Sequence, residues 1–298
     1  MNDTPETVAK NIGLARPARI KKVYYPLPDA LVPAYYVEIA AADKGSTSSE
    51  LYSYVIAAND GRLLKRMSLT QDAAFTYRVW ADGAPNYTPL DGPLADFTPH
   101  PTGTPDGSYP AFIAPSLVTV DGFNKNPSNT FDPWLPAGAT QTNGNNVDAY
   151  VDLSSPDGLS GSDFRASTTA SATFDRTYDT SQNPTSQNQR LAAITQLFYD
   201  NNYYHDYWYD SGFDEAAGNA QADNFGRGGL GNDPILAEGQ DFSGTDNANM
   251  QTPADGDSPI MQMFIFSPPM GSNIARDGTI DGGIIAHEWG HYLHMRLS

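Results

Sequence analysis

Two histidines one helical turn apart constrain this chain more than any other feature. The segment from His287 to His291 has the pattern H-E-x-x-H. On an α-helix, residues four apart lie on one face, so both imidazoles can point at one tetrahedral ion such as zinc. Glu288 lies beside them in a different direction, where its carboxylate can act on a water at the metal as a general base. The pattern therefore indicates a zinc-binding helix with an acid–base residue next to the metal.

The residues around this pattern support a helix with one buried face. Asp281 is suited to be the N-cap, because its side chain can accept a backbone N–H of the first turn. Ile285, Trp289 and Tyr292 recur at helical spacing on the face opposite the histidines. We expect that face to pack into the core and the histidine face to border a cavity.

A catalytic zinc takes three protein ligands, and the helix supplies only two of them. His294 returns to the same face, but it lies roughly 10 Å along the axis from His287, too far to share one ion. We therefore expect the third ligand to be a glutamate from a later helix, after Ser298. By this interpretation the chain is an incomplete enzyme.

Composition restricts the partners and the compartment. The 298 residues carry a formal net charge of −18 and contain no cysteine. Such a charge argues against nucleic acid or an anionic membrane surface as partner, because like charges repel. No apolar run approaches the ~18 residues of a membrane span. The first five residues, Met1 to Pro5, lack the apolar core of an export signal, so for an exported protein we expect the signal to lie outside this chain.

The charge distribution and the strand patterns divide the chain into two parts. Residues 1–66 carry a net charge of +2 and residues 67–298 a net charge of −20. Residues 17–81 read as a small β-rich unit with a hairpin turn at Asn59-Asp60-Gly61. Its expected strands are Ala34–Ala41, Leu51–Ala57, Leu63–Leu69 and Ala74–Ala81. Residues 82–110, rich in Pro, Gly, Asp and Thr, read as a linker.

The second part mixes short strands with one long helix before the zinc helix. Val147–Leu153 and Ile260–Phe266 are expected to be strands. Arg190–Asp210 has helical periodicity and is expected to end at Ser211-Gly212. Residues 213–258 are rich in Gly, Asn and Asp and are expected to be irregular.

Several blocks in one order resemble the fungalysin family of secreted zinc metallopeptidases. The similarity covers roughly residues 130–298, and residues 17–81 more weakly resemble the end of that family's prosegment. The blocks are Tyr203-Tyr204-His205-Asp206, Gly212–Asn219, Asn224-Phe225-Gly226, Asp233-Pro234-Ile235, Ala237–Asp241, Asn247-Ala248-Asn249 and His287–His291 with Arg296-Leu297.

The resemblance implies an α+β fold in which a β-rich prosegment precedes the β-rich N-terminal half of a thermolysin-like catalytic domain, ending in the zinc-binding helix. Residues 1–98 would be the C-terminal part of an inhibitory prosegment with its linker, and 99–298 the N-terminal part of the metallopeptidase domain. His287 and His291 would bind zinc and Glu288 would activate water. Asn247 and Ala248 would bind the substrate backbone by strand addition.

The combined expectation is a secreted zinc metalloendopeptidase that cleaves proteins or peptides and is made as a zymogen held by its own prosegment. Calcium is considered as a second ion, because hard cations take many oxygen ligands. Two alternatives stay open: a non-catalytic module that binds a protein partner and retains a vestigial metal helix, and a zinc hydrolase of non-peptide substrates. The carboxylates considered for calcium are Asp233, Glu238, Asp241, Asp255, Asp257 and Asp277.

Overall fold

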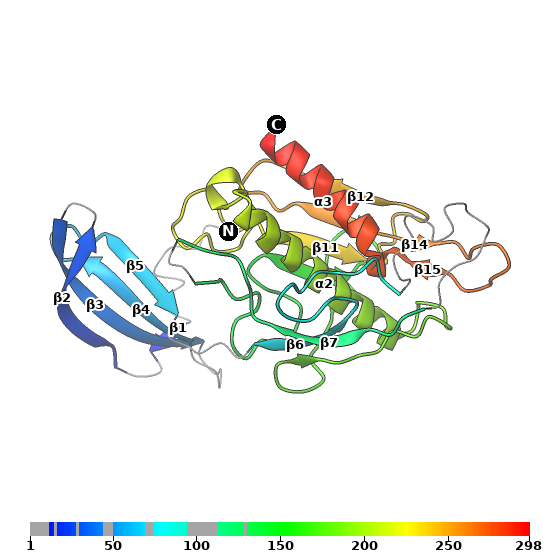
Figure 1. Cartoon of the computed structure of the whole chain (residues 1–298), viewed down its shortest axis with the longest axis horizontal. Helices are drawn as coiled ribbons and strands as arrows, with labels where there is room; N and C mark the ends of the chain where they lie inside the picture. Colours follow the sequence, from blue (N-terminus) through cyan, green and yellow to red (C-terminus); the bar gives the residue numbers. More distant parts are fainter. Residues whose placement is uncertain are drawn as a thin grey trace. The chain divides into compact units, whose positions relative to one another are not determined.

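The computed structural model describes residues 12–14, 17–27, 30–43, 50–68, 74–93, 112–127 and 130–298. The chain divides into two compact units, Met1–Asp72 and Ala73–Ser298 (Figure 1). The α+β class expected from the sequence is confirmed, since one unit is a β-sheet and the other combines sheets with helices.

The first unit is one antiparallel sheet. Its order is β1-β3-β4-β5, and β2 pairs with another stretch of β3, which is the longest strand. The expected turn after β4 is present, with Gly61 at a φ of +75°, a conformation that glycine adopts without strain. The strands are β1 (Ile12–Leu14), β2 (Arg19–Leu27), β3 (Ala30–Asp43), β4 (Glu50–Ala57) and β5 (Leu63–Ser68).

The second unit contains two larger sheets. One has the order β10-β6-β7, from β6 (Phe75–Val79), β7 (Ser116–Val120) and β10 (Thr173–Phe174). The other has the order β12-β13-β11-β8-β9, in which β8, β11 and β13 run parallel and β12 is antiparallel to β13. Its strands are β8 (Val147–Val151), β9 (Phe164–Arg165), β11 (Ile235–Gly239), β12 (Ala248–Gln251) and β13 (Ile260–Met263). A small pair, β14 (Ile265–Phe266) and β15 (Arg276–Asp277), follows.

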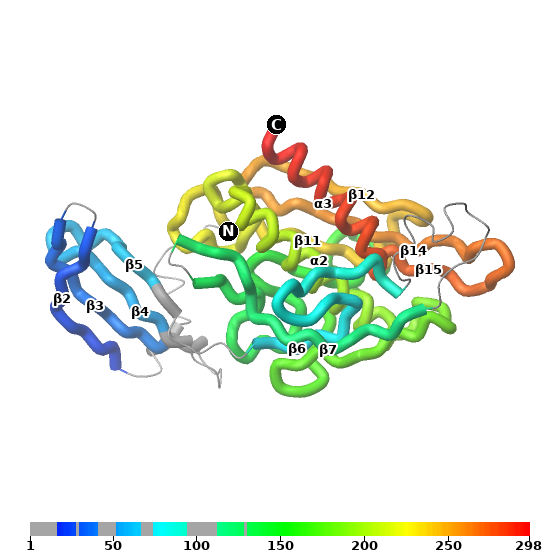
Figure 2. The backbone as a smooth tube through the Cα atoms, viewed as in Figure 1, coloured from blue at the N-terminus to red at the C-terminus, as the bar shows by residue number. Residues whose placement is uncertain are grey.

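The long helix α2 (Gln187–Asp210) is the central element of this unit (Figure 1; Figure 2). It contacts β6, β8 and β11 as well as the last helix, α3 (Gly282–Leu297). Most of its residues are buried, as expected for a helix enclosed on several sides. It starts three residues before the predicted Arg190, with Ser186 as N-cap, and ends at the predicted Ser211. Two short 3₁₀ helices, η1 (Glu215–Ala217) and η2 (Gly278–Ile280), lie in the connections.

An aromatic cluster fills the space between α2 and the β6 sheet. Tyr77 of β6 stacks on Phe174 of β10, with ring planes 2° from parallel. Trp134 meets Tyr199 of α2 edge to face, at 5.3 Å between ring centroids. Each of these four side chains is 0% exposed. Such burial stabilises each aromatic by roughly 1.5–3 kcal/mol, so the cluster fixes α2 against the sheet.

Three expectations from the sequence need correction. The expected strand Ala74–Ala81 exists as β6, but it pairs with β7 and β10 and therefore belongs to the second unit, not to the N-terminal sheet. Residues 213–258 are not wholly irregular, because they contain β11 and β12. Their Gly, Asn and Asp residues lie mostly in the turns. The β11 segment is so short that its pattern did not predict a strand within this composition.

The expected linker is the third correction. Residues 82–93 pack within the second unit: the Leu90 N–H donates to the Trp80 carbonyl at 2.9 Å. At Gly92 an added Cβ would lie 2.4 Å from the Ile280 carbonyl oxygen. An unpacked linker would leave space for a side chain at this position, so residues 82–93 are a packed part of the second unit and not a linker. The remainder of the expected linker, 94–110, lies outside the described residues.

Candidate active site

Helix α3 has the start and the buried face that the sequence predicted. Asp281 is its N-cap, and Oδ1 accepts the Ile284 N–H at 3.0 Å. Ile285, Trp289 and Tyr292 are 0%, 1% and 0% exposed. The opposite face, which carries the histidines, is exposed.

Hydrogen bonds from the buried face fix how α3 is rotated about its axis. Trp289 Nε1 donates to Asn201 Oδ1 of α2 at 2.9 Å. The Tyr292 hydroxyl donates to the Gly218 carbonyl at 3.1 Å and accepts the Ala220 N–H at 2.9 Å. A rotation of α3 would break all three bonds in an interior that excludes water, at about 1–3 kcal/mol for each group left unpaired. The direction of the histidines is thus set by the far side of the helix.

His287 and His291 direct the same ring atom at a common point. Their Nε2 atoms lie 2.9 Å apart, and their rings are nearly perpendicular, with an interplanar angle of 84° and centroids 4.6 Å apart. Two nitrogens bound to one tetrahedral zinc at about 2.0–2.1 Å would stand roughly 3.3 Å apart. A few tenths of an ångström of side-chain rotation reaches that geometry, so the pair fits a zinc ion.

Glu288 lines the same cavity as the two histidines. Its side chain is buried, with 4% exposed, whereas both histidines are exposed. Burial raises the pKa of its carboxyl, and the neighbouring His291 and His287 act in the opposite direction. A carboxylate with a raised pKa next to a metal position is better able to hold a proton transiently, which is the property a general base needs.

These side chains open into a cavity of about 800 Å³. One wall is α3, with His287, Glu288 and His291. Another is the edge strand β12 with the residue before it, so the predicted Asn247 and Ala248 lie in the cavity lining. Their proximity to the histidines was expected, and their role in holding a substrate stays a prediction.

Some lining residues were not singled out from the sequence. Ile284 and Met295 lie three residues before and eight after His287, so helical spacing alone could have identified them. Phe266 of β14 could only be found from the tertiary structure. Asp246 also lies in the lining. Its carboxylate accepts hydrogen bonds from the Ser267 N–H at 2.6 Å and from the Ser267 hydroxyl at 2.8 Å. Among the residues that the structure describes, no third His, Asp or Glu joins the histidine pair as a ligand group.

The carboxylates considered for calcium do not form one group. Asp233 pairs with Arg296 at 3.5 Å, and Asp277 accepts from Gln240 and Thr279. Asp255 accepts the Leu230 N–H at 2.8 Å. In the described part of the chain, Glu238 and Asp241 are the two of these six that gather with further acids. The further acids are Asp152 and Asp157, for which the sequence predicted no calcium binding.

Comparison with known proteins gives the family. Residues 116–298 match the profile of the fungalysin metallopeptidases (M36). The chain belongs to the fungalysin family. The match ends with α3 and includes β7 to β15, so it spans the whole cavity described above. The expectation from the sequence blocks is confirmed.

Curated relatives of the chain are named extracellular metalloproteinases. The chain is 37% identical over 259 residues to the extracellular metalloproteinase MEP of Fusarium vanettenii, over 80% of this chain and 39% of that protein. It is 38% identical to the protein of that name from Pyricularia oryzae, over 68% of this chain and 31% of the relative. The chain thus spans well under half the length of these relatives. In the part of the chain that the structure describes, no helix has the length and hydropathy needed to cross a membrane.

Proposed function

We propose that this fungalysin chain serves a zinc-dependent metalloendopeptidase that hydrolyses peptide bonds of protein substrates. The observation that carries the proposal is the convergence of the His287 and His291 Nε2 atoms beside the buried Glu288, in a cavity flanked by an edge strand. Membership of a metallopeptidase family supports the same chemistry.

The donor set suits zinc. Imidazole nitrogens are zinc's usual ligands, and the two Nε2 atoms are already close to the separation that one ion imposes. His287 and His291 would hold the ion. When bound, zinc supplies a Lewis acid that polarises the scissile carbonyl and makes water more acidic. A third protein ligand would complete the site.

The chain's own residues would perform the proton transfers and the positioning. Glu288 takes a proton from the attacking water and delivers it to the leaving amine. An extended substrate backbone pairs with the free edge of β12, where Asn247 and Ala248 supply polar backbone and side-chain groups. Strand addition recognises a backbone rather than a side chain, which favours a peptide over other hydrolysable substrates.

The decisive test is Glu288→Gln, compared with Glu38→Gln as a matched control in the first unit. Zinc is measured by mass spectrometry on the chain, and cleavage of an unfolded protein is measured on the product of the whole coding sequence. We expect Glu288→Gln to retain zinc and to lose turnover by about 10²–10⁴-fold, the usual contribution of a general base. Full proteolysis by Glu288→Gln would refute the role of this residue.

We further propose that the N-terminal sheet is the end of a prosegment that inhibits the peptidase in cis, and that the protein is secreted. The curated relatives are named extracellular metalloproteinases, which supports secretion. An expected boundary at residue 98 would assign β6 and residues 82–93, which pack within the second unit, to the prosegment, so we propose a boundary near Asp72, between the compact units. Peptidase activity of the product of the whole coding sequence should rise when it is cleaved there, and an unchanged activity would count against inhibition.

The rival interpretation is a non-catalytic module with a vestigial metal helix. No observation favours it, because the histidine pair, the buried glutamate and the edge strand are all arranged around one cavity. Absence of zinc from the purified chain, together with absence of proteolysis by the complete product, would favour it over a peptidase.

A further inference from the structure

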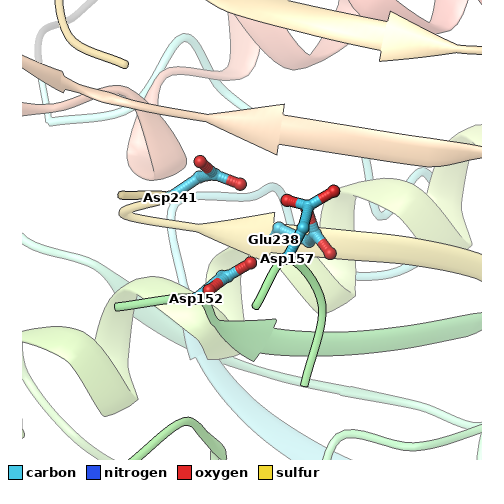
Figure 3. Close-up of side chains that lie close together, drawn as sticks. All are labelled: Asp152, Asp157, Glu238 and Asp241. Carbon is cyan, nitrogen blue, oxygen red and sulfur yellow. The ribbon is translucent and has the colours of Figure 1, made fainter. Parts of the chain in front are cut away.

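We propose that Asp152, Asp157, Glu238 and Asp241 bind one calcium ion, at a site separate from the histidine pair. One carboxylate oxygen of each residue lies within 4.8 Å of those of the other three. Figure 3 shows the four side chains turned toward a shared space at the ends of neighbouring strands. None of the four lines the cavity that contains His287.

The strand register brings these acids together. Parallel pairing places Glu238 of β11 opposite Tyr150 of β8 on one side and Gln262 of β13 on the other. Asp152 directly follows β8, and Asp241 comes two residues after β11. Because parallel strands end at the same edge of a sheet, side chains from both strand ends meet there. Asp157 reaches the group from the loop after β8.

The cluster has too few donors for its carboxylates. Gln262 Nε2 lies within hydrogen-bond distance of Asp157 at 3.0 Å, Glu238 at 3.0 Å and Asp241 at 2.8 Å. An amide nitrogen has two hydrogens and cannot serve all three acceptors. The Tyr150 hydroxyl donates to Glu238 at 2.8 Å. Among the described residues no Lys, Arg or His forms an ion pair with any of the four acids.

Asp152 gives a second and independent indication of a ligand. Its side chain is 0% exposed, and its Oδ2 accepts the Gly158 N–H at 2.8 Å. Its other oxygen, Oδ1, is buried and has no hydrogen-bond partner among the described residues. A buried carboxylate oxygen without a hydrogen-bond partner has lost its hydration without a compensating interaction, which is unfavourable. A cation in the shared space would supply the missing partner.

The donor atoms and their spread select the ion. All are oxygens, which hard cations prefer, whereas zinc prefers nitrogen and sulfur. Ligands on opposite sides of Ca²⁺, at bonds of about 2.3–2.6 Å, stand roughly 4.6–5.2 Å apart, so the observed 4.8 Å limit is within the reach of one ion. Mg²⁺ requires shorter bonds and a near-octahedral shell, and it commonly keeps several waters. Calcium therefore fits best.

The electrostatics without a cation agree with this assignment. Burial raises the pKa of Glu238 to about 8, and the nearby Asp241 and Asp157 contribute, against the lowering effect of Gln262 and Tyr150. Burial likewise raises the pKa of Asp152. Four acids held together in this way must bind either protons or a cation, and a divalent cation neutralises more of them at neutral pH.

The test is calorimetric titration of the 298-residue chain with CaCl₂, with ZnCl₂ held constant so that the histidine pair does not contribute. The variants are Glu238→Gln and Asp157→Asn. Asp157 is exposed, so its variant does not depend on refilling a buried position. The matched control is Asp82→Asn, which removes one exposed negative charge outside the cluster. Thermal unfolding with and without calcium is recorded for each protein.

We expect the chain and Asp82→Asn to bind one Ca²⁺ and to unfold at a higher temperature when it is present. Both cluster variants should bind at least roughly tenfold more weakly and lose most of that shift. The proposal is overturned if the unsubstituted chain binds no calcium, if both cluster variants bind it undiminished, or if Mg²⁺ binds as tightly. None of these results depends on peptidase activity.

Discussion

Two glycines on α3 have opposite surroundings, and alanine at each should shift stability in opposite directions. A Cβ at Gly282 would lie 2.3 Å from the Leu90 carbonyl oxygen, whereas a Cβ at Gly290 would meet no atom within 4 Å. Neither glycine has a positive φ. Alanine is therefore compatible with the backbone at both positions, and only the space differs.

The magnitudes follow from two competing effects. Helix propensity favours alanine over glycine by roughly 0.8–1.0 kcal/mol in a helix interior, and this should stabilise Gly290→Ala almost fully. At Gly282 the neighbour must retreat by at least 0.7 Å to reach the 3.0 Å below which Cβ contacts are essentially never seen. The Leu90 segment is held by its bond to the Trp80 carbonyl. Overpacking of this kind costs about 1–3 kcal/mol, and the propensity gain is smaller at Gly282 because it is the first residue of α3, so we expect Gly282→Ala to destabilise by about 1–2 kcal/mol net.

The assay is urea denaturation followed by tryptophan fluorescence. All four tryptophans lie in the second unit, so the signal reports the unit that contains α3. Equal or greater stability of Gly282→Ala would refute the close packing of residues 82–93 on α3. Loss of stability in Gly290→Ala would refute the open surroundings assigned to that position.

Two further predictions concern the buried face of α3 and a buried acid of α2. Tyr292→Phe leaves the Gly218 carbonyl and the Ala220 N–H unpaired. It should therefore lower the free energy of unfolding by about 2–4 kcal/mol, measured by the same urea denaturation. A loss below about 0.5 kcal/mol would contradict the anchoring role of Tyr292. Burial raises the pKa of Asp200 well above its ordinary value, and the hydrogen bond that Gln196 donates to Asp200 opposes the shift. Because the folded state then holds a proton that the unfolded state releases, stability falls as pH rises from the unfolded pKa of about 3.9 toward the folded value. Asp200→Asn should thus be more stable than the unsubstituted chain at pH 7 and equal to it near pH 3. Urea denaturation at both pH values measures this, and an equal stability of the two proteins at pH 7 would contradict the burial argument.

Helix α3 could be predicted almost completely from the sequence. Its N-cap, its buried face and the shared direction of His287 and His291 follow from residue spacing over one short segment, where 3.6 residues per turn leave no freedom. The family resemblance rested on blocks in a fixed order, and it too is a property of the linear sequence. Local patterns of this kind need no knowledge of which segments meet.

The tertiary structure decided where distant segments meet. Nothing in the spacing of Asp152 and Glu238 shows that parallel pairing of β8 with β11 places them in one cluster, because side chains from two strands are related by register and not by separation along the chain. The same holds for β6, whose pattern predicts a strand but not its sheet, and for residues 82–93, whose turn-rich composition resembles a linker although they pack on α3. The sequence by itself determined that His287 and His291 share one direction, and only the folded chain determined the walls around them and the acids gathered at the neighbouring strand ends.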